Sequence, residues 1–197
     1  MDVPPVGHIY DATMAHVCHA LPLPSKGDKC MESWSIGYMY EALRENAKYQ
    51  SQRYALQTIC RLKMLPLLRE ISDRMFAQAT GKEDLKFVLY SGHDSTVGPL
   101  ELVLEFGPEI WPPYASRIVL ELYSDVANRK PDQEEGLYIK VLFNGRSVTH
   151  KMKWCESKLT ADGLCPYFVF KEYVNTGILK GINEDSYAQA CAKASLF

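Results

Sequence analysis

The stretch "FVLYSGHDSTVGPLELVLEFG", residues 87–107, places a histidine and an aspartate directly after a run of apolar residues. Its start, "KFVLYSG", is continuously apolar, which is typical of a strand covered on both faces. After the pair, Ser95 or Thr96 can cap a helix, and Pro99 suits a first helical turn. The helix is expected to run through "LELVLEF" and to end at Gly107. The stretch therefore predicts a buried strand, a polar pair and a helix in succession.

His93 and Asp94 are that polar pair, and two interpretations fit them. In open α/β sheets ligands collect at the carboxyl ends of strands, and a following helix offers free N–H groups to an anion such as phosphate. A histidine can donate to phosphate oxygens, and an adjacent carboxylic acid with a raised pKa can protonate a leaving group. In the structural interpretation, Asp94 only caps the helix and His93 is a hydrogen-bonded packing residue. The residues alone leave both open.

A helical region is expected before this stretch, over residues 32–79. Pro66 should kink it or begin a second helix, and Gly81 supplies a C-terminal stop. Prolines and glycines in residues 4–29 indicate loops. Apolar residues recur in steps of three and four, the period of one buried helix face, at Ala55, Ile59, Leu62, Leu65, Leu68, Ile71 and Met75.

The chain after residue 107 reads as further α/β structure. "RIVLELY" alternates in apolar residues and predicts a strand with Ile118, Leu120 and Leu122 on one side. "LYIKVLF" and "RSVTH" flank "NG", which tolerates the positive φ of a tight hairpin turn. Helix is expected again near residues 168–174. We therefore predict a helical part over residues 1–80 and an α/β part over residues 81–197.

Composition is that of a globular protein: 197 residues, 47% hydrophobic and 23% charged. A formal net charge of −2 and a pI near 6.2 argue against nucleic acid or an anionic membrane as partner. No apolar run approaches the roughly 20 residues of a membrane span. The first residues do not have the pattern of a signal peptide. They do not resemble the beginning of a natural domain either, which favours an N-terminal truncation.

Six cysteines permit disulfides without demanding them in a chain of this length. His16, Cys18, His19 and Cys30 could be read as a zinc site, but their spacing is irregular and a disulfide fits better. No acceptor for N-glycosylation is present. The compartment therefore stays open on composition alone.

Several motifs together resemble the second half of the histidine acid phosphatases. "LYSGHDSTV" and "PPYASRIVLELY" are similar to the family's Tyr-Ser-x-His-Asp run and its later Pro-Pro-Tyr-Ala-Ser block. "YDATMAHVCHALPLP", "LPLLREISDRM", "VLFNG" and "LCPYFVFKEYV" resemble segments on either side. The resemblance covers nearly the whole chain, but only about the last half of a family member.

This resemblance implies a fold, a chemistry and a substrate class. The fold would be α/β, part of a phosphoglycerate-mutase-like phosphatase sheet with a helical cap portion, its N-terminal half missing. His93 would bind the phosphoryl group and stabilise its transition state, and Asp94 would donate a proton to the leaving alcohol. No metal or organic cofactor is implied. The implied substrate is a phosphorylated sugar, the 2-phosphoxylose of a proteoglycan linkage region, and the implied location is the Golgi and secretory pathway.

The nucleophile of the family is the histidine of an Arg-His-Gly motif, which becomes phosphorylated. None of the five histidines here follows an arginine: His8, His16, His19, His93 and His150. The isolated chain is therefore predicted to be an inactive half-site, and residues 87–91 are predicted to form an unpaired apolar strand edge. The alternative hypothesis is a truncated, non-catalytic chain that at most binds a phosphosugar or a protein partner.

The resemblance also bears on the cysteines. Cys155 and Cys165 resemble the family's local C-terminal pair, whereas Cys191 resembles a cysteine that bonds to the missing half and would be free here. The usual partner position of Cys18 is occupied by Arg117, which makes Cys30 a candidate substitute.

Two further groups of residues could take part in catalysis or substrate binding. Ser91 and Ser95 are poor candidates for a serine nucleophile, because neither lies in a Gly-x-Ser-x-Gly elbow. Trp34, Tyr38 and Tyr40 have helical spacing, which favours a place in the core over a substrate cleft.

Overall fold

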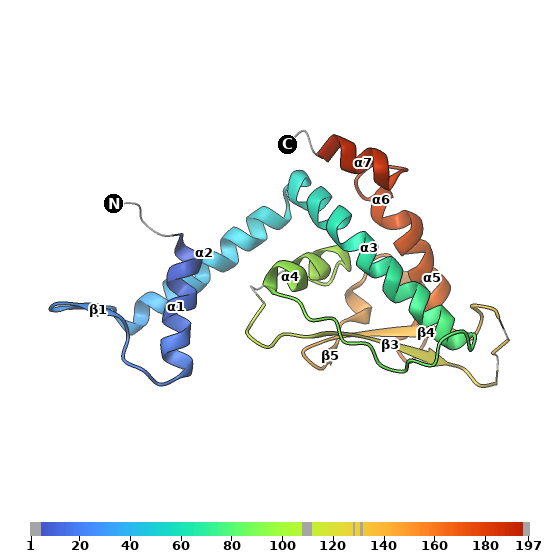
Figure 1. Ribbon diagram of the computed structural model, residues 1–197, viewed down its shortest axis with the longest axis horizontal. Helices are drawn as coiled ribbons and strands as arrows, with labels where there is room; N and C mark the ends of the chain where they lie inside the picture. The colour runs from blue at the N-terminus through green and yellow to red at the C-terminus, as the bar shows by residue number, and fades with distance from the viewer. Residues whose placement is uncertain (1–4, 108–111, 128, 131, 195–197) are drawn as a thin grey trace. The chain divides into compact units, whose positions relative to one another are not determined.

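The computed structural model describes residues 5–107, 112–127, 129–130 and 132–194 (Figure 1). The chain forms two compact units, of which the first runs up to Gln50 and the second begins at Ser51. The division therefore lies before the helix at residues 54–79, whereas the sequence predicted a boundary near residue 80. The assignment of residues 1–80 to a helical cap and of 81–197 to a phosphatase domain stays a prediction.

The first unit consists of two helices and a short antiparallel hairpin, namely α1 (Val6–Cys18), β1 (Ser25–Lys26), β2 (Lys29–Cys30) and α2 (Ser33–Ser51). Gly27 turns the hairpin with φ +60. The expectation of loops throughout residues 4–29 is wrong for α1. The prolines flank this helix rather than interrupt it, because Pro5 is its N-cap and Pro22 follows its last turn.

The second unit opens with α3 (Tyr54–Ala79), the longest helix of the described chain. The break in the helical region falls before Tyr54, and α3 continues through Pro66, so of the two alternatives predicted for this proline the start of a second helix is wrong. Leu65 and Leu68 on either side of Pro66 are fully buried, and their packing offsets the backbone hydrogen bond that proline cannot make. Gly81, with φ +70, follows the end of α3 and confirms the predicted stop.

A four-stranded sheet lies at the centre of the second unit, with β3 (Ile118–Ser124), β4 (Leu137–Phe143), β5 (Arg146–Ser147) and β6 (Cys165–Pro166). All its pairs are antiparallel, and β4 pairs with each of the other three strands. Asn144 and Gly145 join β4 to β5 with φ values of 49 and 82. These values confirm the predicted tight turn.

Short helices complete the second unit. They are α4 (Asp94–Val103), η1 (Thr149–Lys151), η2 (Glu156–Lys158), α5 (Tyr167–Glu172), η3 (Tyr173–Gly177), α6 (Ile178–Lys180) and α7 (Tyr187–Ala194). The helix predicted near residues 168–174 is confirmed, and it extends further through the π-helical turn η3. A Cβ at Gly177 would lie only 2.6 Å from the Tyr173 ring, so this turn needs glycine there.

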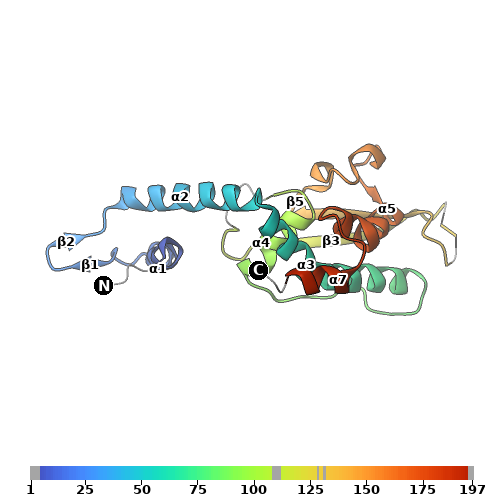
Figure 2. The ribbon, with the colours of Figure 1, turned by 90° about the horizontal axis from the view of Figure 1, so that it is seen from above.

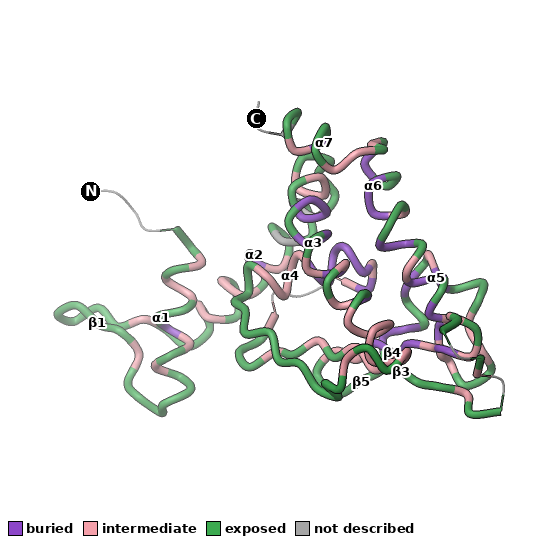
Figure 3. The backbone as a smooth tube through the Cα atoms, turned by 45° about the vertical axis from the view of Figure 1, so that its right-hand side comes forward, coloured by how far each residue is buried: buried purple, intermediate pink, exposed green. Residues whose placement is uncertain are grey.

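The core of the second unit lies where its helices cover one side of the sheet (Figure 1). Buried stretches gather on α3, α4, β4, α5 and α6 (Figure 3). The C-terminal helix α7 packs beside α3 (Figure 2). Side chains with no exposed surface lie in α3, α4, β4, α5 and α6 or directly after α4. They include Leu65, Leu68, Val103, Leu104, Ile139, Val141, Phe170 and Ile178.

The strand predicted at residues 87–91 is absent from the structure. The segment is extended but pairs with no strand, and its exposure alternates, with Phe87 and Leu89 both 78% exposed and Val88 and Tyr90 both 40% exposed. No backbone–backbone hydrogen bond is formed by residues 84–92 within the described chain. A β-strand needs a neighbouring strand, which none of the described strands provides here, so the prediction of a strand covered on both faces is wrong for this chain. The exposed, unpaired apolar side chains agree with the other prediction, that the segment is left without a strand partner.

Candidate functional site

His93 and Asp94 lie where the extended segment meets α4. His93 is the N-cap, with φ −108 and ψ 179, and Asp94 is the first helical residue. The expected cap at Ser95 or Thr96 is therefore wrong, since the N-cap lies two residues before Ser95 and three before Thr96. Neither side chain is buried, so both groups of the pair are accessible to a ligand.

The helix start is held by backbone contacts of His93. Its carbonyl oxygen accepts from the N–H groups of Thr96 and Val97, each at 2.9 Å. Oδ1 of Asp94 accepts from the Ser95 N–H at 2.7 Å, whereas the His93 side chain makes no capping hydrogen bond. A carboxylate at this end of a helix is favoured by the helix dipole, and so is an external anion. The geometry is compatible with the phosphate-binding interpretation. The structural interpretation is wrong for His93, whose side chain is exposed rather than packed, and the N-cap is His93 rather than Asp94.

Gly92 lets the backbone before α4 lie close to the side chain of Thr96 in the first turn of that helix. A Cβ at this position would lie 3.0 Å from the Thr96 Cβ and 3.1 Å from its Oγ1. Contacts below about 3.4 Å require the neighbour to shift. Glycine thus allows the backbone before His93 to pass directly against the first turn of α4.

A polar network ties the segment before the pair to α3. The Tyr90 hydroxyl donates to Oε1 of Glu70 at 3.2 Å, and Nε of Arg74 donates to the same oxygen at 3.0 Å. Arg74 also donates from Nη1 to Oε1 of Glu83 at 2.6 Å. Through these contacts α3 sets the path of the chain that leads to His93.

The far end of α4 is anchored by buried polar contacts. The Arg61 guanidinium of α3 donates to Oε1 of Glu105 and to the Tyr173 hydroxyl, both at 3.1 Å. The Tyr173 hydroxyl in turn donates to the Val103 carbonyl at 2.5 Å. The Trp154 indole N–H donates to the carbonyl of Leu104 at 3.3 Å. Helix α4 is therefore fixed at its C-terminal end, which steadies the pair at its N-terminal end.

Glu101 of α4 is a buried carboxyl that the sequence did not predict. Only 3% of it is exposed, and its Oε1 has no hydrogen-bond partner among the described residues. Burial raises the pKa of this carboxyl to about 7. The sequence does not indicate that Glu101 is buried, because a glutamate between leucines in "LELVLEF" resembles a residue on the solvent face of an amphipathic helix.

The other candidate residues belong to other elements of the chain. His8, His16 and His19 belong to the first unit, and His150 lies in η1 of the second. Nδ1 of His16 bonds to the carbonyl of Pro22 at 2.6 Å. No group of three potential metal ligands comes together in the described part of the chain. The zinc interpretation of residues 16–30 is therefore not supported.

The cysteines divide into one disulfide and four free thiols. Cys155 and Cys165 form a disulfide, which we call the C-terminal disulfide and which confirms the pair expected from the resemblance. Cys18 and Cys30 are free and exposed, so the substitute pairing considered for them is wrong. Cys191 also carries a free thiol.

The aromatic residues Trp34, Tyr38 and Tyr40 of α2 were expected in the core, but two of them are exposed. Trp34 is 64% exposed and Tyr38 is 72% exposed. Their rings lie edge to face, with ring centroids 5.5 Å apart. Tyr40 is partly buried and contacts the Tyr10 ring at 6.2 Å. Only Tyr40 of the three therefore contributes to packing in the first unit.

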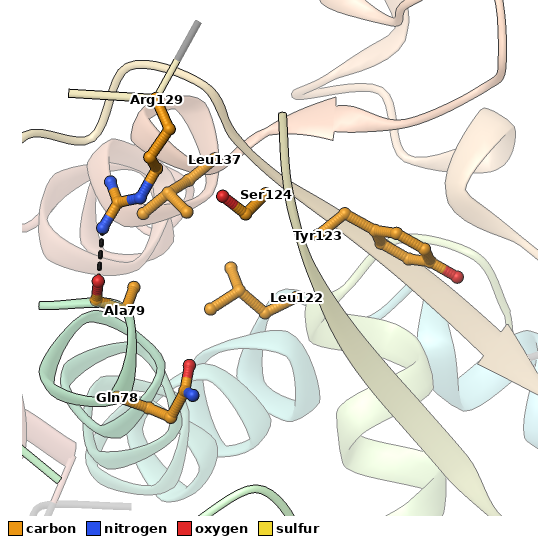
Figure 4. A pocket seen from close by; sticks show the side chains of 7 residues that line it. All are labelled: Gln78, Ala79, Leu122, Tyr123, Ser124, Arg129 and Leu137. Carbon is orange, nitrogen blue, oxygen red and sulfur yellow. Dashed lines mark hydrogen bonds between the residues drawn. The ribbon is translucent and has the colours of Figure 1, made fainter. Parts of the chain in front are cut away.

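One pocket of the second unit lies away from the pair (Figure 4). Its volume is about 240 Å³, which is small for a ligand site. Arg129 closes one side by donating to the Ala79 carbonyl, as Figure 4 shows. The remaining lining residues are Gln78, Leu122, Tyr123, Ser124 and Leu137. Neither His93 nor Asp94 lines this pocket.

The described helices were also considered as membrane spans. None of them combines the length and the apolar character that crossing a membrane requires.

Comparison with known proteins identifies the family. The family described as "Histidine phosphatase superfamily (branch 2)" matches residues 11–144. Similar proteins include 2-phosphoxylose phosphatase 1 of Xenopus tropicalis, 30% identical over 185 residues that cover 92% of this chain and 36% of the relative. Counting factor 60 of Dictyostelium discoideum is 31% identical over 188 residues, which cover 95% of this chain and 39% of the relative. The human 2-phosphoxylose phosphatase 1 is 25% identical over 187 residues, 92% of this chain and 38% of that protein.

The chain thus spans well under half the length of these curated relatives. The matched residues contain the His93–Asp94 pair and the motifs "LYSGHDSTV" and "PPYASRIVLELY", whereas "LCPYFVFKEYV" at residues 164–174 lies outside them. The resemblance to histidine acid phosphatases is confirmed at the level of the family. The chain belongs to the histidine phosphatase superfamily, branch 2.

Proposed function

We propose that this chain carries the proton donor and one phosphate-binding group of a phosphomonoesterase. Asp94 protonates the leaving oxygen, and His93 binds the phosphoryl group and stabilises its transition state. The observation that supports this most is the exposure of both side chains at the first turn of α4. Membership in the histidine phosphatase superfamily supports phosphatase chemistry at the family level.

The charge state of Asp94 matters for phosphate binding at this helix end. An ionised Asp94 places a negative charge beside the phosphate dianion, which the positive end of the helix dipole offsets only in part. A protonated Asp94 removes that repulsion and at the same time carries the proton that the leaving group needs.

The proposed reaction runs in two steps through a phosphohistidine. A nucleophilic histidine nitrogen attacks phosphorus, the bond from phosphorus to the alcohol oxygen breaks, and Asp94 gives that oxygen its proton. Water then breaks the phosphorus–nitrogen bond, and the Asp94 carboxylate takes a proton from the water. None of the five histidines follows an arginine. We propose that the nucleophile belongs to an Arg-His-Gly segment outside the printed sequence and that the isolated chain is inactive.

The proposed substrate is the 2-phosphate of xylose in the linkage region between glycosaminoglycan and protein. Support comes from the relatives called 2-phosphoxylose phosphatase 1 in three of the organisms compared, Xenopus tropicalis, Danio rerio and Homo sapiens. The proposed place of action is the Golgi and secretory pathway. The C-terminal disulfide is compatible with this proposal, because disulfides persist in oxidising compartments.

Phosphate binding by the isolated chain tests the assigned roles. Titration with inorganic phosphate should give weak binding that His93→Asn abolishes and that Asp94→Asn strengthens, because the amide removes a negative charge. His150→Asn is the matched control, since His150 is an exposed histidine of the same unit. Equal binding by the unchanged chain and His93→Asn would refute the role of His93.

Hydrolysis separates the enzyme from the non-catalytic alternative. The isolated chain should not hydrolyse 4-nitrophenyl phosphate or 2-phosphoxylose at acidic pH. A chimera that places the upstream half of the Xenopus relative before this chain should do so, and Asp94→Asn should lower its kcat roughly 100-fold or more. Turnover by the isolated chain would contradict the missing nucleophile. A folded chimera that binds phosphate without turnover would favour the non-catalytic alternative.

A further inference from the structure

Glu101 has an enclosed carboxyl group near the end of α4. Only 3% of the residue is exposed, and Oε1 finds no hydrogen-bond donor among the described residues. Residues 104–107 fold back over it, with the Phe106 N–H donating to the Glu101 carbonyl at 3.2 Å. A Cβ added at Gly107 would lie 2.7 Å from Oε2, so the backbone there covers the carboxyl directly. The carboxyl group is therefore closed off from water, and one of its oxygens has no hydrogen-bond donor among the described residues.

The two terminal nitrogens of the Arg61 guanidinium, which packs at this end of α4, have other partners, whereas its Nε has none among the described residues. Arg61 of α3 pairs with Glu105 at 3.1 Å and also binds the Tyr173 hydroxyl of η3. These contacts leave Glu101 without a cation, and burial alone raises the pKa of its carboxyl to about 7. His150, exposed in η1, is another titratable side chain of this unit to be controlled for between pH 5 and 8.

We propose that Glu101 is a proton-binding latch that holds residues 104–107 closed over a neutral carboxylic acid and loosens them when that acid ionises. An enclosed neutral acid lacks one hydrogen bond, whereas an enclosed carboxylate without a cation costs far more. Ionisation therefore favours movement of residues 104–107 that would admit water. This device is a property of α4 and does not depend on the proposed phosphatase reaction.

The sign of the pH dependence follows from linkage. The folded state keeps its proton up to about pH 7, whereas the unfolded glutamate loses it near 4.5. Between these values the folded chain binds more protons, so the stabilisation is complete below pH 4.5 and is lost as pH rises through 7. From pH 5 to pH 8 the contribution of Glu101 should lower the folding equilibrium constant by roughly 70-fold.

Trp154 provides a local reporter for this latch. Its indole N–H donates to the carbonyl of Leu104 at 3.3 Å, and its ring stacks on Tyr173 at 4.5 Å. Loosening of residues 104–107 should therefore change the indole N–H resonance before the unit unfolds. The resonance can be assigned by its loss in Trp154→Phe.

The test is an NMR titration of the purified chain from pH 5 to 8. The Trp154 indole signal should shift with a midpoint near 7 in the unchanged chain and should not shift in Glu101→Gln. His150→Asn should keep the transition, and Glu135→Gln, which alters an exposed glutamate, should keep it too. Urea unfolding should lose most of its decline in stability above pH 5 in Glu101→Gln alone.

Three outcomes would overturn the proposal. The first is a transition that persists in Glu101→Gln, and the second is a transition that disappears in His150→Asn. The third is a Glu101 carboxyl that titrates in the ordinary range of a solvated glutamate. That last measurement uses the ¹³C signal of the side chain in the unchanged protein, so it remains decisive even if Glu101→Gln does not fold.

Discussion

The buried contact between Arg61 and Glu105 leads to an asymmetric prediction. The Arg61 side chain is 8% exposed, whereas that of Glu105 is 26% exposed. Glu105→Ala leaves a buried guanidinium without its counter-ion, whereas Arg61→Met removes the buried charge itself. We therefore expect Glu105→Ala to destabilise the second unit more than Arg61→Met, although both break the same ion pair.

The magnitudes follow from what each variant leaves behind. An uncompensated buried charge costs roughly 3 kcal/mol, and the strain of φ +65 at Glu105 cancels because alanine bears it as well. Arg61→Met loses two hydrogen bonds, but the apolar side chain fills the space, and the Tyr173 hydroxyl keeps its bond to Val103. We expect a loss of about 1–2 kcal/mol for this variant.

Urea unfolding followed by Trp154 fluorescence measures both losses, and the double variant completes the cycle. Arg61→Met with Glu105→Ala should cost little more than Arg61→Met alone, because the unpaired charge is absent. Additive losses, or a larger loss for Arg61→Met than for Glu105→Ala, would refute the argument that desolvation of the guanidinium dominates this contact.

Other substitutions test the packing and the exposed segment. Gly98→Ala should stabilise the unit by roughly 0.5–1 kcal/mol, since no atom lies within 4 Å of the added Cβ in α4, as thermal unfolding would reveal. Gly107→Ala should instead cost about 1–2 kcal/mol by crowding Glu101, and equal effects of the two would contradict the close contact. Reduction of the C-terminal disulfide, whose cysteines are 10 residues apart, should lower the free energy of unfolding by about 2.5 kcal/mol; no change in the urea midpoint would argue against it. Replacing Phe87 and Leu89 by lysine should reduce self-association in light scattering with little loss of stability, because both are 78% exposed.

Local signals in the sequence predicted the parts of the fold that depend on neighbouring residues. Asn144 and Gly145 fixed the hairpin because their positive φ values are a property of these two residues. The strand at residues 118–124 followed from its alternation, and Gly81 marked the end of α3. The position of the His93–Asp94 pair at the start of a helix was also correct.

The errors lie where distant parts of the chain decide the structure. Residues 87–91 have the composition of a buried strand, but strand formation depends on a partner that the sequence pattern does not specify. Glu101 has the pattern of a solvent-facing residue, and it is buried because the chain folds back at Gly107. Pro66 lies inside a continuous helix because tertiary packing outweighs its local preference.

The network of Tyr90, Glu70, Arg74 and Glu83 has a consequence for the entropy of strand pairing. It tethers the exposed segment at Tyr90 to a long helix, so the chain before His93 is held at one point along its length. Ordering one residue of a free chain costs roughly 1–2 kcal/mol, and a tethered template avoids part of that cost. Any strand that pairs with residues 85–91 would therefore meet a preorganised edge, and Tyr90→Phe would slow that pairing more than it would weaken the fold.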